Sequence, residues 1–189
     1  MPTPTTDLTG HLLIAMPGMA DPRFARSVVF LCRHSDEGAF GLVINKPLPE
    51  MRLSAFLAQF DLACTPSADE GEVHFGGPVE TNRGFVLHTA DYSSREGTQE
   101  VTPGVNLSAT LDVLADLAVG EGPRGAIVAL GYAGWGPGQL EREIGQNAWL
   151  TTLARNDLLF RTPAEGKWAA AVRAMGIDPQ LLSSHAGRA

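Results

Sequence analysis

Two residues with reactive side chains, Cys32 and His34, lie two positions apart at the end of an apolar run that begins at Val28. Alternate residues of a strand share a face, so a continuous strand would place the thiol and the imidazole together and Arg33 on the other side. A thiolate and an imidazole so placed can act as nucleophile and base. A lone cysteine in a Val/Phe/Leu run is more often an inert core residue, which is the competing interpretation.

A second pair, Arg83 and His88, flanks an apolar segment that follows the glycine turn Gly76-Gly77-Pro78. An arginine can clamp a carboxylate through two parallel hydrogen bonds, and a histidine titrates near neutral pH. These properties suit a ligand site or acid–base catalysis by His88. The alternative is structural, with the glycines forming a turn and the histidine ending a strand.

The segment 131–138 contains four glycines and separates an apolar run, 126–130, from a predicted helix at 140–144. Glycines in such a loop let backbone N–H groups point outward at a helix N-terminus, where they attract anions or polar groups. Neither G-x-G-x-x-G nor a P-loop is present with the required spacing. Two interpretations remain: a tight turn around Trp135, or a small polar-ligand pocket lined by Tyr132, Trp135 and Gln139.

Other catalytic and metal-binding patterns are missing from the sequence. The five histidines show no metal-ligand spacing, and no serine lies in a G-x-S-x-G motif. We therefore predict no metal, no cofactor and no serine-hydrolase chemistry.

The elements that must position these residues are short strands alternating with helices. The β-rich runs 27–32 and 40–45 flank a polar link that ends in Gly38, which predicts a hairpin. Further strands are expected at 11–16, 84–88 and 126–130.

Three helices are expected from apolar spacing and capping residues. One covers residues 53–60, with Leu53, Phe56, Leu57 and Phe60 facing inward. A second begins at Ser108 as N-cap and ends before Gly120, and a third begins at Thr162 as N-cap. The polar stretch 64–71 is expected to be an exposed loop.

Length and charge limit the function classes. The chain has 189 residues, which predicts one domain over residues 1–189, with residues 1–8 loosely ordered. Its formal net charge of −7 repels nucleic-acid phosphates and anionic lipids, and no window is rich in Lys or Arg. The two cysteines form no disulfide framework, and no apolar run has the length of a membrane span or signal sequence. These features favour a cytoplasmic protein with reduced thiols.

Several motifs together resemble those of the AlgH/YqgE family of small bacterial proteins, whose best-known member is labelled a transcriptional regulator. They are Gly10-His11-Leu12-Leu13-Ile14-Ala15-Met16-Pro17, Gly41-Leu42-Val43-Ile44-Asn45-Lys46-Pro47, Phe75-Gly76-Gly77-Pro78-Val79, Arg83-Gly84-Phe85-Val86-Leu87-His88 and the 131–141 segment. The resemblance implies an α+β fold in which a mixed, bifurcated β-sheet curls into a pseudo-barrel with helices packed outside. It implies no established activity.

The first functional hypothesis is a non-enzymatic, cytoplasmic regulatory protein that binds a small polar ligand or a protein partner without direct DNA contact. Turns and strand ends of a rigid sheet are where such a site would form. The expected binding residues are Asn45, Lys46, Gly76, Gly77, Arg83, His88, Tyr132, Trp135 and Gln139. The alternatives are an enzyme that uses His88 or the Cys32–His34 pair, and a DNA-binding transcriptional regulator. The latter requires a basic face that the charge pattern does not predict.

Overall fold

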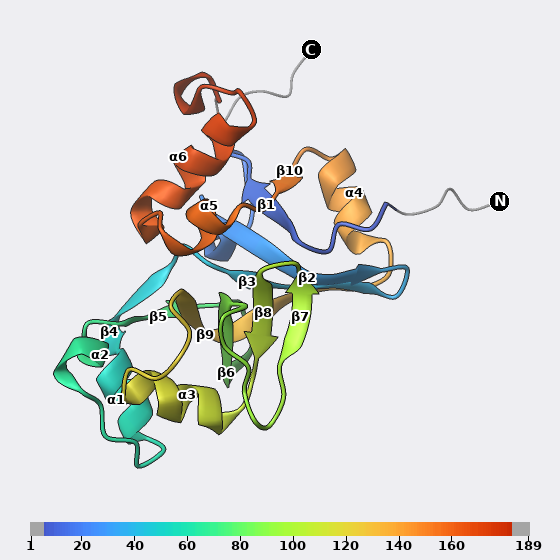
Figure 1. The fold of residues 1–189 in the computed structure, drawn as a ribbon. Coiled ribbons are helices and arrows are strands. Elements are labelled where there is room, and N and C mark those ends of the chain that lie inside the picture. Colours follow the sequence, from blue (N-terminus) through green and yellow to red (C-terminus); the bar gives the residue numbers. More distant parts are fainter. Residues whose placement is uncertain (1–5, 183–189) are drawn as a thin grey trace.

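The computed structural model describes residues 6–182, which form an α+β fold of ten strands and six α-helices (Figure 1). The strands are β1 (His11–Ala15), β2 (Val28–Ser35), β3 (Gly38–Val43), β4 (Pro47–Arg52), β5 (Glu72–Phe75), β6 (Val79–Thr89), β7 (Gln99–Thr102), β8 (Val105–Ser108), β9 (Ala126–Trp135) and β10 (Trp149–Leu153). The helices are α1 (Leu53–Ala58), α2 (Pro66–Asp69), α3 (Leu111–Ala118), α4 (Gln139–Gly145), α5 (Asn156–Phe160) and α6 (Ala164–Ala174). Short 3-10 turns occupy Pro22–Phe24 and Pro179–Leu181.

The strands form one curled sheet in the order β10-β1-β2-β3-β9-β6-β8-β7, with β5 and then β4 branching from β9. Among the described strands, the β5–β9 pair is parallel and every other pairing is antiparallel. The sheet is therefore mixed and bifurcated, and it curls into a half-barrel, as the family resemblance implied.

Strand β9 makes the bifurcation possible because its two halves have different partners. Residues 128–130 pair with both β5 and β6, whereas residues 133–135 pair with β3. The expectation that this strand ends at Leu130 is wrong. Gly131 takes a positive φ of 73° and the strand continues, because β3 offers a second edge up to Trp135. The glycine loop before α4 shortens to residues 136–138.

Three apolar clusters hold the helices on the sheet. Figure 1 shows α1, α2 and α3 gathered at one end of the molecule, and α4, α5 and α6 at the other. The largest cluster lies inside the curl and receives Trp168 and Val172 from α6. A second packs the outer face of β1–β3 against α4, and a third packs α1 and α3 on β5, β6 and β9. Both faces of β1 are thus buried, which explains its unbroken apolar sequence.

Several local expectations are confirmed. Strands β2 and β3 form the predicted hairpin, and Gly120 follows α3 with a φ of 78°. Other details differ. Helix α3 begins with Thr110 at its N-cap position, because Ser108 pairs with Val86 as the last residue of β8.

Differences also occur at the other predicted helices. Helix α1 ends at Ala58, and the stretch 64–71, expected to be a loop, contains the short helix α2. Thr162 does not cap α6, since its hydroxyl donates to the carbonyl of Asp157. Of the segment expected to be loosely ordered, residues 1–5 lie outside the described residues, and Leu8 packs against the second cluster.

Candidate functional site

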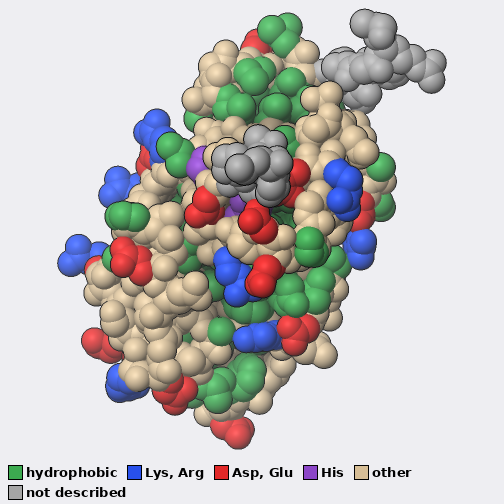
Figure 2. All heavy atoms as spheres, turned by 90° about the vertical axis from the view of Figure 1, so that its right-hand side faces the viewer, with side chains coloured by type: hydrophobic (Ala, Val, Ile, Leu, Met, Phe, Trp, Pro, Cys, Tyr) green, Lys and Arg blue, Asp and Glu red, His purple; other side chains and the backbone are tan. Residues whose placement is uncertain are grey.

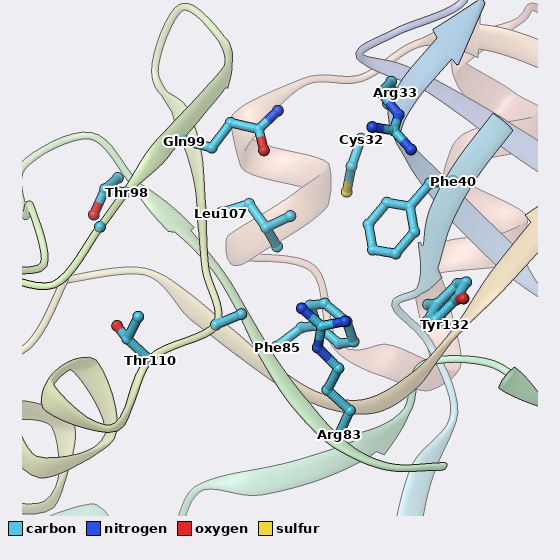
Figure 3. A pocket seen from close by; sticks show the side chains of 12 residues that line it. Cys32, Arg33, Phe40, Arg83, Phe85, Thr98, Gln99, Leu107, Thr110 and Tyr132 are labelled. Atoms are coloured by element: carbon cyan, nitrogen blue, oxygen red, sulfur yellow. The ribbon is translucent and has the colours of Figure 1, made fainter. Parts of the chain in front are cut away.

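A large hollow lies where the curled sheet fails to close. At one end of β7 the sheet edges meet: Thr102 packs so closely against Gly10, just before β1, that a Cβ on Gly10 would overlap the Thr102 side chain. At the other end, Gln99 is separated from β2 and β3 by a cavity of about 600 Å³ (Figure 3). We call it the wedge cavity, and its lining residues are Cys32, Arg33, Phe40, Arg83, Phe85, Gly97, Thr98, Gln99, Leu107, Ala109, Thr110 and Tyr132. This volume is in the range of small-molecule sites.

A β-bulge in β2 builds one wall of the wedge cavity. Leu31 pairs with Gly41 and Arg33 pairs with Phe40, so Cys32 is an extra residue on β2. The bulge lets Cys32 and Arg33, consecutive in sequence, both line the wedge cavity. Sequence alternation alone would have placed them on opposite faces.

The same bulge separates Cys32 from His34. The imidazole of His34 lies at the outer face of the sheet, where its Nε2 is 2.8 Å from the carboxylate of Glu141 in α4 and its Nδ1 accepts from the amide of Leu8. The expectation that thiol and imidazole share a face is therefore wrong. Burial raises the pKa of the Cys32 thiol, which further disfavours a thiolate nucleophile.

The floor of the wedge cavity is aromatic. The ring of Phe40 lies 4.8 Å from that of Tyr132 and 5.5 Å from that of Phe85, measured between centroids. Tyr132 and Phe85 meet edge to face at 6.0 Å. These rings come from β3, β6 and β9, the three neighbouring strands at the centre of the sheet, and together they offer a rigid apolar surface.

The charges at the wedge cavity are of one sign. Its lining includes two arginines, Arg33 and Arg83, and no Asp or Glu, although the whole chain carries a net charge of −7. The guanidinium of Arg83 lies over the ring of Phe85, 5.0 Å from its centroid, and 3.5 Å from the carboxylate of Glu80. Both partners of this ion pair are more than half exposed, so the pair is weak. The cavity is therefore suited to an anion.

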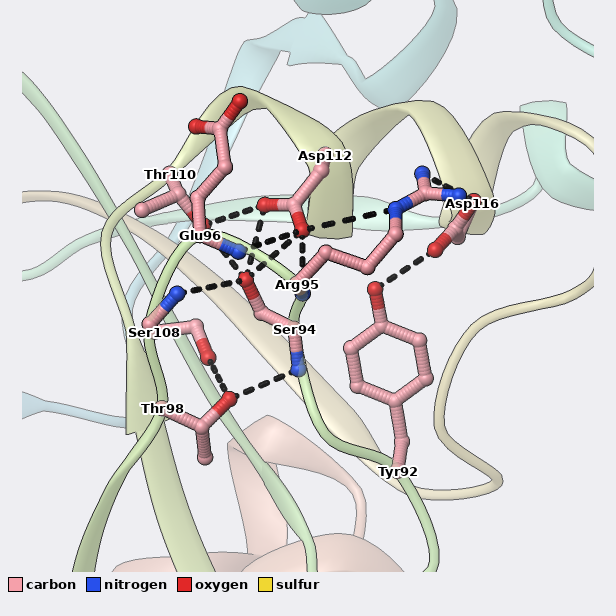
Figure 4. Close-up of polar contacts among 10 residues, drawn as sticks. Tyr92, Ser94, Arg95, Glu96, Thr98, Ser108, Thr110, Asp112 and Asp116 are labelled. Atoms are coloured by element: carbon pink, nitrogen blue, oxygen red, sulfur yellow. Dashed lines mark hydrogen bonds and ion pairs between the residues drawn. The ribbon is translucent and has the colours of Figure 1, made fainter.

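The wall formed by residues 97–98 is held from behind by a buried carboxylate, Asp112 (Figure 4). It accepts hydrogen bonds from the hydroxyls of Ser94 and Thr110 and from the backbone amides of Arg95 and Glu96. Burial raises the pKa of Asp112, but these hydrogen bonds outweigh it and hold the pKa well below the usual range. The carboxylate of Asp112 thus fixes the loop before β7, and with it one side of the wedge cavity.

His88 lies behind this wall and does not line the wedge cavity. Its Nδ1 is 2.9 Å from the carbonyl of Thr89, which can only accept, so Nδ1 carries the proton. Burial lowers the pKa of His88, so the ring is neutral at pH 7 and its Nε2 accepts from the hydroxyl of Ser108 at 2.9 Å. The oxygen of Ser108 is in turn 3.0 Å from that of Thr98, a lining residue. Both ring nitrogens are engaged in hydrogen bonds that support the wall.

Asn45 and Lys46 stabilise the chain after β3. The Asn45 side chain accepts from the amide of Val28 at 2.8 Å and donates to the carbonyl of Arg26 at 2.9 Å. The backbone carbonyl of Lys46 accepts from the amide of Phe75, and burial lowers the pKa of the Lys46 amine. Neither residue lines the wedge cavity.

Gly76 and Gly77 allow a close crossing of two chain segments. A Cβ on Gly76 would overlap the carbonyl of Gly131, and one on Gly77 would overlap the backbone of Tyr132. These glycines therefore act indirectly, by letting the turn after β5 pass over β9 where β9 carries Tyr132 to the cavity.

Trp135 and Gln139 meet at another place, around the carboxylate of Glu143 in α4. Trp135 donates to it through Nε1 at 2.9 Å, Gln139 through Nε2 at 2.9 Å, and Trp149 through Nε1 at 2.8 Å. Glu143 thereby links α4 to β9 and β10. The polar groups of Trp135 and Gln139 are thus engaged in hydrogen bonds that hold the helix in place.

Of the expected site residues, Arg83, Tyr132 and Cys32 thus come together, and the others lie elsewhere. Among the lining residues that sequence reasoning missed are Arg33, Phe40, Phe85, Gln99 and Leu107. Phe40, Phe85 and Leu107 have the alternating spacing of ordinary core residues, which carries no functional signal. Arg33 directly follows the apolar run 28–32, and no local sequence pattern marks the bulge that turns it to the cavity.

Comparisons with known proteins agree with this architecture. A family model described as AlgH-like matches residues 12–180. A UPF0301 protein of Cereibacter sphaeroides is 52% identical over 183 residues, covering 97% of this chain and 100% of that protein. A UPF0301 protein of Rhodospirillum rubrum is 53% identical over 182 residues, covering 96% and 94%.

Two solved structures are similar over nearly their whole length. The solution structure of the AlgH protein from Pseudomonas aeruginosa has a TM-score of 0.78 and 42% identity, and all of both chains is covered. A crystal structure of a protein from Corynebacterium diphtheriae has a TM-score of 0.72 at 19% identity, with 95% of this chain and 92% of that chain covered, which shows a shared fold. None of these names states a reaction or a ligand.

Proposed function

The chain belongs to the AlgH-like family, and we propose that it is a regulatory protein of the cytoplasm that binds a small molecule in the wedge cavity. One observation carries the proposal: the cavity joins an aromatic floor to two arginines, with no lining carboxylate in a strongly acidic chain. An apolar pocket with a few convergent polar groups is the usual form of a ligand site.

The rigidity of the walls supports binding over a purely structural role. Phe40, Phe85 and Tyr132 are fixed by contacts among strands, and the loop carrying Thr98 is fixed by Asp112. A preformed site loses little conformational entropy when a ligand enters.

The enzyme and DNA-binding hypotheses receive less support. His88 is committed to two hydrogen bonds, and burial raises the pKa of Cys32. On the face drawn in Figure 2, Lys and Arg side chains alternate with Asp and Glu, which does not favour a duplex phosphate backbone. Within residues 6–182, no helix is long and apolar enough to cross a membrane.

A thermal-shift screen against a metabolite library tests the proposal. A ligand at 100 times its Kd stabilises the native state by about 2.7 kcal/mol, which for a chain of this size raises Tm by roughly 5–10 °C. The variant Ala109→Phe places a ring in the wedge cavity from an exposed position and should abolish the shift. The matched control is Ala55→Phe, at an exposed position of α1 outside the cavity lining, which should retain the shift. Ligands that shift both variants equally would contradict the proposal.

A further inference from the structure

The two arginines of the wedge cavity come from different walls. Arg33 belongs to β2 and Arg83 to β6. Figure 3 shows their guanidinium groups at opposite sides of the cavity, with the ring of Phe40 between them, the ring of Phe85 against the Arg83 guanidinium and Leu107 to one side. Two cations separated by an apolar surface do not resemble a site for a single anionic point charge. They match a molecule with an anionic group toward each end.

Two of the neutral polar side chains of the lining are already hydrogen-bonded within the protein, which leaves recognition to the two arginines, Gln99 and Tyr132. Thr110 is bonded to Asp112, and Thr98 is bonded to the amide of Ser94 and the hydroxyl of Ser108. Among the described residues, the side chains of Arg33 and Gln99 make no hydrogen bond, and in Figure 3 the Gln99 amide points across the cavity toward the wall formed by β2. Arg83 has an exposed ion pair with Glu80, which an incoming anion can replace.

The charge balance points the same way. Two guanidinium groups and no carboxylate line the wedge cavity, and the charge of Arg83 is offset only by the exposed Glu80 outside the lining. A ligand with two anionic groups can pair with both arginines, whereas a monoanion can pair with only one of them. Planar guanidinium groups form paired hydrogen bonds with carboxylates and phosphates alike.

Resting on the proposed binding function, we propose that the wedge cavity selects a small dianion with an apolar body. Its anionic groups contact Arg33 and Arg83, its body lies on Phe40, Phe85 and Leu107, and its polar edge faces the amide of Gln99. A dicarboxylate and a phosphorylated carboxylic acid both have an anionic group at each end, and "dianion" refers here to these two groups, since a phosphate monoester alone carries a charge of about −1.5 to −2 at pH 7.

The experiment is isothermal titration calorimetry with probes that share one aromatic body. They are 1,4-phenylenediacetate as dicarboxylate, 4-phosphonooxyphenylacetate as phosphorylated acid, 4-methylphenylacetate as monoanion and 4-methylphenylacetamide as neutral analogue. We expect at least one dianion to bind about tenfold or more tightly than the monoanion, since a charge-assisted hydrogen bond contributes on that order. The probe that binds more tightly shows whether the cavity prefers a dicarboxylate or a phosphorylated acid.

Variants assign the effect to the arginines. Arg33→Met and Arg83→Met keep an apolar stem, and each should weaken dianion binding about tenfold, to the level of the monoanion. Both side chains are exposed enough for the variants to fold. Arg173→Met, an exposed arginine of α6 outside the cavity lining, should leave all affinities unchanged.

Equal affinities for the dianions and the monoanion would overturn the proposal, as would an Arg33→Met variant that still prefers the dianions. All four probes could fail to bind while the library screen finds a ligand of another charge whose thermal shift is abolished in Ala109→Phe. That result would reject the dianion and leave the proposed binding function intact. Failure of both the probes and the screen would reject both.

Discussion

At the scale of single residues, Cys32 shows how burial decides chemistry. Its sulfur borders the wedge cavity in Figure 3, yet the residue is only 3% exposed, and burial raises the pKa of its thiol. Cys64 is partly exposed on a loop. The two thiols therefore differ mainly in how easily a reagent in solution can reach them.

We expect native protein to show one accessible thiol. Cys64 should react with a disulfide reagent at pH 8, and Cys32 should react about a hundredfold more slowly, because it needs local opening and deprotonation in an apolar site. Stopped-flow absorbance measures both phases, and Cys64→Ser should remove the fast one. Two equally fast thiols in the native protein would show that Cys32 is open to solvent.

Gly77 is the residue whose backbone position is least tolerant of a side chain. Gly77→Ala should lower the free energy of unfolding by about 3 kcal/mol or more, because the added methyl would overlap the backbone of Tyr132 and Ala133. Gly145→Ala is the control: a Cβ on this helix residue meets nothing within 4 Å, so the change should be neutral or stabilise by up to about 1 kcal/mol. Urea denaturation measures both, and equal effects would refute the close crossing.

At the scale of elements, the loop before β7 depends on one carboxylate at the start of α3. Asp112 accepts from four donors, three in the consecutive loop residues Ser94, Arg95 and Glu96 and one in Thr110, just before α3. A neutral amide cannot accept from all of them, since one of its two polar atoms is itself a donor. The position of the cavity wall is thus controlled by a group that never touches the cavity.

Asp112→Asn should destabilise the protein by about 2–3 kcal/mol and increase hydrogen exchange at the amides of Arg95 and Glu96. The folded pKa of Asp112 is depressed below 3.8, so its contribution is present above that pH and is lost as pH falls through the folded value. The stabilities of wild type and variant should therefore converge in acid. Glu96→Gln is the control, because its exposed side chain makes no hydrogen bond among the described residues. An unchanged exchange rate in Asp112→Asn would contradict the clamp.

Helix α6 carries a buried lysine, Lys167, whose amine donates to the carbonyls of Ile44 and Leu159. Burial lowers its pKa to about 8 from 10.5. Between these values the unfolded chain binds more protons than the native state, so this group makes stability rise with pH, by about 3 kcal/mol at most.

The rise is best measured as a difference, because the raised pKa of Cys32 acts in the opposite sense above pH 9. The free energy of unfolding of wild type minus that of Lys167→Met should increase from pH 8 to pH 10, since the variant lacks the titrating amine. Chemical denaturation at several pH values gives both numbers. A difference that stays constant or falls with pH would show that Lys167 has an ordinary pKa.

At the scale of the whole molecule, much of the fold was predictable and the site was not. The hairpin of β2 and β3 and the helix at 111–118 follow from local periodicity and turn residues, and the curled sheet followed from resemblance. The wedge cavity depends on distant events: the bulge at Cys32 is set by the register with Phe40 and Gly41, and the opening exists because β7 touches Gly10 at one end only. Neither interaction has a local sequence signature, so Arg33 was assigned to the wrong face.

The central claim is that a small molecule occupies the space between β7 and the bulged end of β2. The most direct measurement is a titration of ¹⁵N-labelled protein with 1,4-phenylenediacetate, followed by NMR of side-chain N–H groups. The predicted result is a saturable shift of the Arg33 and Arg83 Nε–H signals and of the Gln99 amide, with Arg173 unmoved. Two results would contradict the claim. One is that chemical-shift changes are confined to residues outside the wedge cavity, and the other is that no ligand that raises Tm shifts these side-chain signals.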